Sequence, residues 1–280
     1  MEPTKKTLLQ FRDMKQQKEK ITVLTAYDYP TARLVEQAGM DMILIGDSLG
    51  MVVLGYDSTV PVTMEDMLHH AKAVRRGAAQ TFLVVDMPFM SYNVSTAEAI
   101  RNAGRLMQEG GADAVKLEGG ETIAATAAAI VRAGIPVMGH IGLTPQTATQ
   151  LGGFKVQGRD RAAAESLLRD ARAIERAGAF AITLEAMPQQ LAAYITAGLS
   201  IPTIGIGAGA ECDGQVLVLH DLIGLFPRFV PKFVKQYAQL SANIVEACRQ
   251  YQQEVRQGAF PAAEHCFNMN AELLAGLLDD

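Results

Sequence analysis

The chain has 280 residues, of which 49% are hydrophobic and 20% are charged. This balance excludes a disordered or collagen-like chain and leaves enough apolar material for a large core. Because 25 Lys and Arg residues stand against 30 Asp and Glu residues, the net charge is −5 at pH 7. The chain therefore has no overall positive field for nucleic acid or an anionic membrane surface, and we expect neither as a partner.

The cysteines and the N-terminus indicate a cellular location. Cys212, Cys248 and Cys266 are scattered and odd in number, so they predict neither a disulfide framework nor a zinc knuckle. The N-terminal segment is charged, and it holds no apolar run long enough for a signal sequence or a membrane span. We expect a cytoplasmic protein.

From residue 21 onward, short aliphatic runs alternate with longer Ala-rich segments that have helical spacing of apolar residues. The predicted strands are 21–27, 42–46, 81–86, 114–117, 136–139, 180–184, 202–206 and 215–219. The predicted helices between them are 29–38, 64–78, 96–109, 122–133, 162–177 and 188–196. Eight continuously apolar strands, buried on both faces and alternating with helices, predict a (β/α)8 TIM barrel of class α/β.

The whole chain, residues 1–280, is predicted to form a single barrel domain. Residues 7–17 are expected to form a helix that caps the bottom of the barrel, and 232–255 a long amphipathic closing helix. The C-terminal tail, 268–280, carries the stripe Leu273, Leu274, Leu277 and Leu278. Two interpretations stay open for it: a disordered terminus, or a short helix that docks on a neighbouring subunit.

Polar residues follow the predicted strands at their carboxyl ends, where a parallel barrel places its active site. These residues are Asp28, Asp47, Ser48, Asp86, Lys116, Glu118, His140 and Glu185. Any one of them taken alone fits a solvated turn or a helix cap. Several acids and two bases converging on one rim favour a functional site instead.

Three of these acids, Asp47, Asp86 and Glu118, are expected to face one point from successive strand ends. Carboxylates so close together repel each other, and a divalent cation relieves the repulsion. Mg²⁺ suits a few carboxylates with water and a chelating substrate better than Zn²⁺ does. The alternative is that Asp86 and Glu118 only cap the turns that follow them.

Three further features have two interpretations each. The glycine-interrupted stretch 46–59 is long enough to serve as a lid over the site. His140 is either a buried histidine bonded to backbone or a donor to a substrate anion. The glycine run 204–209 lacks interleaved basic or hydroxyl residues and is followed by Glu211 and Asp213, so we favour close approach of a flat organic ligand over a phosphate loop.

Seven segments together resemble the ketopantoate hydroxymethyltransferase family. They are Gly46-Asp-Ser-Leu-Gly50, Asp86-Met-Pro-Phe89, Val115-Lys-Leu-Glu-Gly119, Gly139-His140 with Gly142-Leu-Thr-Pro-Gln146, Leu151-Gly-Gly-Phe-Lys-Val-Gln-Gly-Arg159, Leu184-Glu-Ala186 and Ile204-Gly-Ile-Gly-Ala-Gly209. The resemblance runs from about residue 21 to about residue 267. The run 151–159 is its most specific part, because no generic structural need dictates it. The tail 268–280 continues beyond the family pattern.

The resemblance implies a barrel of the phosphoenolpyruvate/pyruvate superfamily, assembled as a homo-oligomer, by analogy a decamer. It implies Mg²⁺, with 5,10-methylenetetrahydrofolate as co-substrate, and transfer of a hydroxymethyl group to 3-methyl-2-oxobutanoate to give ketopantoate. Asp47, Asp86 and Glu118 match the acids around the metal, and Glu185 matches the catalytic base. The residues that match substrate-binding positions are Asp47, Ser48, Asp86, Lys116 and His140.

Two other functions remain as alternatives. Another Mg²⁺-dependent lyase or mutase acting on an α-keto acid would use the same three carboxylates with a different base. A catalytically silent barrel would serve as a binding or assembly protein, but it would be expected to have lost some of its polar rim residues, and here the rim is complete.

Overall fold

The strands form one closed parallel barrel in the computed structural model, which describes residues 5–226 and 228–272. Each strand pairs with the next along the chain, and the ring closes where Val23 of the first strand lies opposite Val216 of the last. The strands are β1 (Ile21–Thr25), β2 (Met42–Ile45), β3 (Phe82–Asp86), β4 (Ala114–Glu118), β5 (Val137–Gly142), β6 (Ala181–Glu185), β7 (Thr203–Ile206) and β8 (Gly214–Leu217). The predicted TIM barrel is confirmed.

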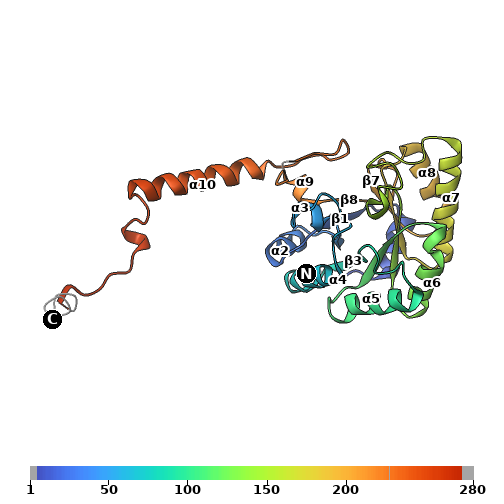
Figure 1. The fold of residues 1–280 in the computed structure, drawn as a ribbon, viewed down its shortest axis with the longest axis horizontal. Helices are drawn as coiled ribbons and strands as arrows, with labels where there is room; N and C mark the ends of the chain where they lie inside the picture. The colour runs from blue at the N-terminus through green and yellow to red at the C-terminus, as the bar shows by residue number, and fades with distance from the viewer. Residues whose placement is uncertain (1–4, 227, 273–280) are drawn as a thin grey trace.

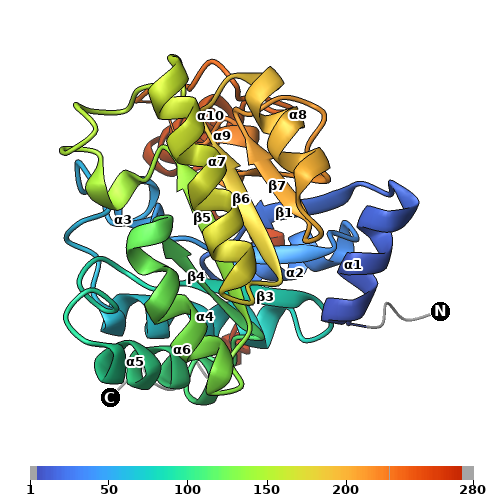
Figure 2. The same cartoon turned by 90° about the vertical axis from the view of Figure 1, so that its right-hand side faces the viewer.

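Helices surround the barrel on the outside (Figures 1 and 2). The longer ones are α2 (Tyr29–Gln37), α4 (Met64–Gly77), α5 (Thr96–Gln108), α6 (Ala124–Arg132), α7 (Arg161–Arg176) and α8 (Gln189–Gly198). The short elements are α3 (Leu49–Val52), α9 (Leu219–Leu222), η1 (Glu121–Ile123), η2 (Pro145–Thr147) and η3 (Ala263–His265). Four connections after helices contain Gly39, Gly111, Gly134 and Gly178 at positive φ, as the sequence pattern predicts for helix ends.

Two apolar layers alternate along each strand, since successive side chains point to opposite faces. In β2, Ile43 and Ile45 point outward to the helices, whereas Met42 and Leu44 point into the barrel. Both layers are almost fully buried. This explains why the strands read as continuously apolar, and it fixes which residues at the strand ends face the barrel axis.

A helix at the bottom of the barrel, α1 (Leu8–Gln17), confirms the predicted capping helix. Thr7 and Gln10 form a capping box at its start, which satisfies backbone donors that the first turn leaves free. The buried residues Phe11 and Met14 join the interior core. The Phe11 ring lies 5.2 Å from that of Phe82 in an edge-on arrangement, so α1 closes the lower end of the barrel with apolar side chains.

We expect Phe11→Ala to lower the free energy of unfolding by about 3–5 kcal/mol, the usual range for truncating a buried phenylalanine. The reason is that the cavity would open at the end of the interior core, where the barrel strands cannot collapse to fill it. Leu9→Ala on the exposed face of the same helix is the control and should change this energy by less than about 0.5 kcal/mol. Urea titration followed by circular dichroism measures both, and equal losses would contradict the assignment of Phe11 to the core.

The predicted closing helix, 232–255, is wrong in its bounds and in its place. Residues 232–239 are not helical, and α10 (Leu240–Gln257) extends away from the barrel (Figure 1). None of its described residues is buried. The amphipathic pattern identifies a helix with one apolar face, but it does not say which barrel surface that face would cover.

The barrel surface beside β8 and β1 has less helix cover than the rest. The outward residues Thr22 and Gln215 are exposed, and Leu24 and Leu217 are only half-buried, whereas outward residues of the other strands, such as Leu83, are fully buried.

The predicted leucine stripe at 273–278 lies outside the described residues. Among the helices of residues 5–226 and 228–272, none is long and apolar enough to cross a membrane.

Candidate active site

Six charged residues meet at the carboxyl ends of β2 to β6. Five of them continue the inward register of their strands, because they lie two or four positions after residues of the interior core. These five are Asp86 after Val84, Lys116 and Glu118 after Ala114, His140 after Met138, and Glu185 after Ala181. Asp47 follows the end of β2. All six side chains are buried or nearly so.

Five of these side chains form a chain of close charge contacts across β3 to β6. Lys116 Nζ lies 2.8 Å from Asp86 Oδ1 and 3.2 Å from His140 Nδ1. His140 Nδ1 also lies 3.3 Å from Glu118 Oε1, and its Nε2 lies 3.0 Å from Glu185 Oε2. The structure thus brings together Asp86, Lys116, Glu118, His140 and Glu185. It also places His140 inside β5, which extends to Gly142, instead of after a strand that ends at residue 139.

Asp47 is connected to the same cluster by hydrogen bonds to one neighbouring acid, Asp86, and to the amide of Gln146. Its backbone N–H donates to Asp86 Oδ2 at 3.0 Å, and the side-chain amide of Gln146 donates to Asp47 Oδ2 at 2.8 Å. The Gln146 backbone N–H donates to Glu118 Oε2 at 3.0 Å, and Tyr92 donates its hydroxyl to Gln146 Oε1 at 2.7 Å. Sequence analysis missed Gln146 and Tyr92 as site residues. The segment Gly142-Leu-Thr-Pro-Gln146 held the only signal for Gln146.

Ser48 lies at the edge of the cluster, next to Asp47 and at the start of α3. Its hydroxyl does not cap that helix but shares a 2.8 Å hydrogen bond with the hydroxyl of Tyr27. Tyr27 is fully buried and follows β1. Sequence analysis included it only as a strand residue, so the structure adds a residue that orients the Ser48 hydroxyl.

The pKa values of the three acids Asp47, Asp86 and Glu118 are not all shifted in the same direction. Burial raises the pKa of Asp47 well above its usual value, and the negative charges of Asp86 and Glu118 raise it further. Burial also raises the pKa of Asp86, although Lys116 opposes the shift. For Glu118, the nearby His140 and Lys116 outweigh burial, so its pKa is lowered. The excess negative charge therefore falls on Asp47 and Asp86.

The two bases are both held in their charged forms. Burial lowers the pKa of Lys116, but the carboxylates of Asp86, Glu118 and Asp47 outweigh it and raise the pKa above its usual value. Burial and the Lys116 charge lower the pKa of His140, whereas Glu118 and Glu185 raise it, and the net result is a pKa of about 9. At neutral pH the site thus presents two buried cations.

We expect the raised pKa of His140 to make stability fall with rising pH. Because the folded-state pKa of about 9 exceeds the ordinary value of 6.5, the imidazolium contributes fully below pH 6.5 and its contribution is lost by about pH 9. The loss is at most about 3 kcal/mol, from about 1.4 kcal/mol per pKa unit. Thermal unfolding of the unliganded protein between pH 6 and 9.5 measures it. In His140→Gln this part of the decline should be missing, and parallel profiles for the two proteins would contradict the assignment.

The donor set fits a divalent cation held by two acids and not by three. Asp47 and Asp86 offer hard oxygens whose negative charge is poorly compensated. Asp86 Oδ1 forms a 2.8 Å ion pair with Lys116, but the pair is not aligned as a hydrogen bond. This oxygen has no hydrogen-bond partner among the described residues. Both oxygens of Glu118 are already engaged by His140 and Gln146. Within residues 5–226 and 228–272, no three His, Cys, Asp or Glu side chains converge as a metal site, so substrate and water oxygens would complete the coordination of an ion such as Mg²⁺.

Three sequence-based interpretations change in the structure. Asp28 lies three residues after the end of β1 and caps α2, where its carboxylate accepts from Thr31 N at 2.8 Å. The stretch 46–59 is not a continuous loop, because α3 lies within it. In the glycine run 204–209, a Cβ on Gly207 would meet the Phe233 ring at 2.7 Å. At Gly207 the close approach is thus made by a side chain of the protein itself, and the approach of a flat organic ligand to this run stays a prediction.

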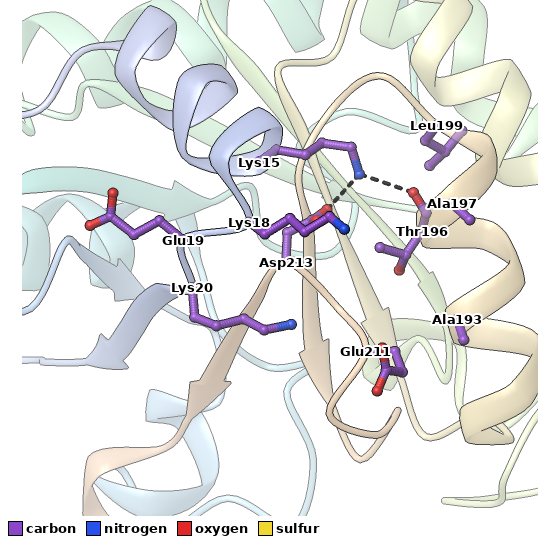
Figure 3. Close-up of a pocket in the computed structure, with 10 residues that line it drawn as sticks. All are labelled: Lys15, Lys18, Glu19, Lys20, Ala193, Thr196, Ala197, Leu199, Glu211 and Asp213. Atoms are coloured by element: carbon purple, nitrogen blue, oxygen red, sulfur yellow. Dashed lines mark hydrogen bonds and ion pairs between the residues drawn. The ribbon is translucent and has the colours of Figure 1, made fainter.

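A cavity of about 380 Å³ lies at the opposite, lower end of the barrel (Figure 3). The charged residues that line it are Lys15, Lys18, Lys20, Glu19, Glu211 and Asp213. Lys15 Nζ is held by Asp213 at 2.7 Å and by the Thr196 carbonyl at 3.0 Å. Its acids and bases are balanced, and it includes none of the rim residues. The polar cluster at the carboxyl ends of the strands is therefore the better candidate for an active site.

Solved structures confirm the type of fold by their similarity to this chain. A phosphonopyruvate hydrolase matches with a TM-score of 0.62 at 15% identity, covering 99% of this chain and 95% of that one. A 2,3-dimethylmalate lyase, described as a member of the phosphoenolpyruvate mutase/isocitrate lyase superfamily, matches with a TM-score of 0.59 at 17% identity, covering 97% and 94%. At these identities the likeness shows the fold alone, a TIM barrel.

Sequence comparison gives the family. The ketopantoate hydroxymethyltransferase family matches residues 5–263. A 3-methyl-2-oxobutanoate hydroxymethyltransferase of Dehalococcoides mccartyi (strain CBDB1) is 60% identical over 271 residues, which cover 97% of each chain. One of Moorella thermoacetica is 62% identical over 261 residues, which cover 93% of this chain and 97% of that relative. The chain belongs to the ketopantoate hydroxymethyltransferase family, and it is an enzyme of the hydroxymethyltransferase kind.

Proposed function

We propose that this enzyme transfers a hydroxymethyl group from 5,10-methylenetetrahydrofolate to 3-methyl-2-oxobutanoate, with Mg²⁺, to give ketopantoate. The observation that carries the proposal is the position of the Glu185 carboxylate, 3.0 Å from His140 Nε2, in the same buried cluster as Lys116 and the poorly compensated acids Asp47 and Asp86. Such a site suits a small keto acid anion that must lose a proton from carbon. Membership of the family supports the choice of substrate.

Lys116 and His140 would bind and orient the keto acid. Both are buried cations, so they attract the substrate carboxylate in a place from which water is largely excluded. Ser48, whose hydroxyl is oriented by Tyr27, would donate a further hydrogen bond. Asp47 and Asp86 would hold the Mg²⁺ ion, which when bound supplies a positive charge that stabilises negative charge developing on the keto oxygen.

Glu185 would act as the general base. Its Oε2 lies 3.0 Å from His140 Nε2 without hydrogen-bond alignment, so the carboxylate is free to turn to a substrate proton. It would remove the C3 proton of 3-methyl-2-oxobutanoate, and C3 would then form a bond to the one-carbon unit of the folate. Water supplies the hydroxyl of the product, and tetrahydrofolate leaves. Neighbouring His140 would stabilise the carboxylate before the transfer.

The test is a turnover assay with 3-methyl-2-oxobutanoate and 5,10-methylenetetrahydrofolate, first with Mg²⁺ and then with a chelator. We expect ketopantoate with both substrates and the metal, and none when either substrate or the metal is removed. Other α-keto acids without folate form the second arm. Cleavage or rearrangement of one of these, with no folate-dependent product, would replace the proposal with a lyase or mutase activity.

The homo-oligomer expected from the sequence is also a proposal, and α10 supports it. Leu240, Ile244, Tyr251 and Val255 recur at helical spacing on one face of α10, and all are exposed. A lone helix with such a face is poorly stable in water. The sparsely covered outer face of β8 and β1, where Leu24 and Leu217 are only half-buried, offers a partly apolar surface that this helix of a second copy would cover. The decameric count and the cytoplasmic location remain predictions.

Ile244→Glu is expected to shift the assembly toward smaller species, because the charge would enter the contact between subunits. Sedimentation velocity at several protein concentrations measures the shift. Gln253→Glu adds the same charge on the opposite face of α10 and should leave the sedimentation profile unchanged. An unchanged profile for Ile244→Glu would show that this face is not the contact between copies.

A further inference from the structure

Gln146 joins more parts of the active site than any single charged residue does. Its side-chain amide donates to Asp47 Oδ2 at 2.8 Å and to the Met87 carbonyl at 2.9 Å, and its backbone N–H donates to Glu118 Oε2 at 3.0 Å. It is 4% exposed and comes from η2, after β5. One residue thus connects the ends of β2, β3 and β4 from a fourth position on the rim.

The orientation of this amide is fixed by its partners. The two protons on Nε2 face two acceptors, Asp47 Oδ2 and the Met87 carbonyl, while Oε1 receives the hydroxyl proton of Tyr92 at 2.7 Å. Turning the amide by half a rotation would bring Oε1 against both acceptors. Tyr92 is buried, and its hydroxyl also accepts from Glu118 N at 3.3 Å. The hydroxyl has a second acceptor, the Glu118 carbonyl at 3.2 Å, but Gln146 Oε1 is closer at 2.7 Å, so we assign the proton to Gln146.

We propose that Gln146, itself oriented by Tyr92, is a positioning residue that holds the carboxylate of Asp47 in the arrangement used to bind the metal and directs the carboxylate of Glu118 to His140. This inference rests on the proposed function, because it assigns the metal to Asp47 and Asp86. Groups that hydrogen-bond to metal ligands fix ligand orientation, and their loss typically costs about 10- to 100-fold in metal affinity.

Two consequences follow from the contacts. With Oδ2 of Asp47 held by Gln146, the other carboxylate oxygen is the one left to bind the cation. With Oε2 of Glu118 held by the Gln146 backbone, Oε1 is directed to His140. Gln146 is therefore connected to His140, the neighbour of the proposed base Glu185, through the single side chain of Glu118.

The experiment measures Mn²⁺ affinity of the unliganded protein by electron paramagnetic resonance, without turnover. Gln146→Met keeps the length and burial of the side chain but removes the amide, and we expect Mn²⁺ to bind at least about 10-fold more weakly. Tyr92→Phe leaves the amide in place but frees it to turn, and should cause a smaller loss in the same direction. In the double variant, affinity should be no weaker than in Gln146→Met, because Tyr92 acts through Gln146.

Gln150→Leu is the matched control, because Gln150 is exposed and only four residues further along. It should leave Mn²⁺ affinity unchanged. The midpoint of thermal unfolding without metal is also measured for every variant. If Gln146 has a purely structural role, Gln146→Met should lower this midpoint and leave the Mn²⁺ affinity within twofold of the parent. That result would overturn the inference. If Gln146→Met does not fold, the Mn²⁺ affinity of Tyr92→Phe provides the test, and an affinity equal to that of the parent would overturn the inference.

Asp47→Asn separates this inference from the proposed function. If Asp47→Asn loses Mn²⁺ binding and the Gln146 and Tyr92 variants do not, the metal site stands and the positioning role fails. If Asp47→Asn binds Mn²⁺ as the parent does, the metal is not held at this acid, and both proposals fail at that point.

Discussion

Glu185→Gln is expected to lower kcat by at least about 100-fold with little change in the KM for 3-methyl-2-oxobutanoate. Loss of a positioned general base commonly costs about 10²- to 10⁴-fold. Glutamine keeps the shape of the side chain at the end of β6 but cannot accept the C3 proton. Lys116 and His140 remain to bind the substrate carboxylate, so binding should survive.

Deuterium exchange at C3 identifies the step that is lost. In D₂O with Mg²⁺ and no folate, the parent enzyme should exchange the C3 proton of the keto acid, and Glu185→Gln should not. Glu165→Gln on the exposed side of α7 is the control and should exchange normally. Normal exchange by Glu185→Gln would mean that another residue is the base.

Asp86→Asn is expected to abolish metal-dependent turnover and to destabilise the fold. Asp86 lies 2.8 Å from the buried Lys116 ammonium, so neutralising the acid leaves a cation without its partner in the barrel interior. Breaking such a buried pair typically costs about 3–5 kcal/mol. The same change removes one of the two acids that would hold Mg²⁺.

The double variant Asp86→Asn with Lys116→Met separates the two effects. Removing both charges should restore much of the stability lost in Asp86→Asn, as measured by urea unfolding. Turnover with added Mg²⁺ should stay absent. Recovery of turnover along with stability would show that Asp86 serves only the fold. Turnover by Asp86→Asn alone would remove this residue from the proposed metal site.

The barrel and its polar rim are predictable from the sequence alone, because both follow from local periodicity. Continuously apolar strands alternating with helices require burial on both faces, and a parallel barrel gathers the carboxyl ends of its strands. Asp86, Lys116, His140 and Glu185 were therefore predicted to meet, and their inward register follows from the period of two along each strand. The capping helix was equally local, since Thr7 and Gln10 begin it.

Tertiary structure decided the contacts that no local pattern encodes. Gln146 reaches Asp47 across 99 positions in the sequence, and Tyr92 reaches Gln146 across 54. Neither residue type carries a charge that would have drawn attention to it. Asp28, by contrast, carries a charge but serves as a helix cap, because the strand before it ends two residues earlier than its apolar run predicted.

The position of α10 was also beyond the sequence. Its apolar face predicts burial, but the hydrophobic effect is non-directional and depends only on the area removed from water. The apolar face of α10 would be buried equally well against the barrel of its own chain or against the barrel of another copy. The chain after α9 continues into a helix that leaves its own barrel, and only the arrangement of the whole chain in space decides between these two surfaces.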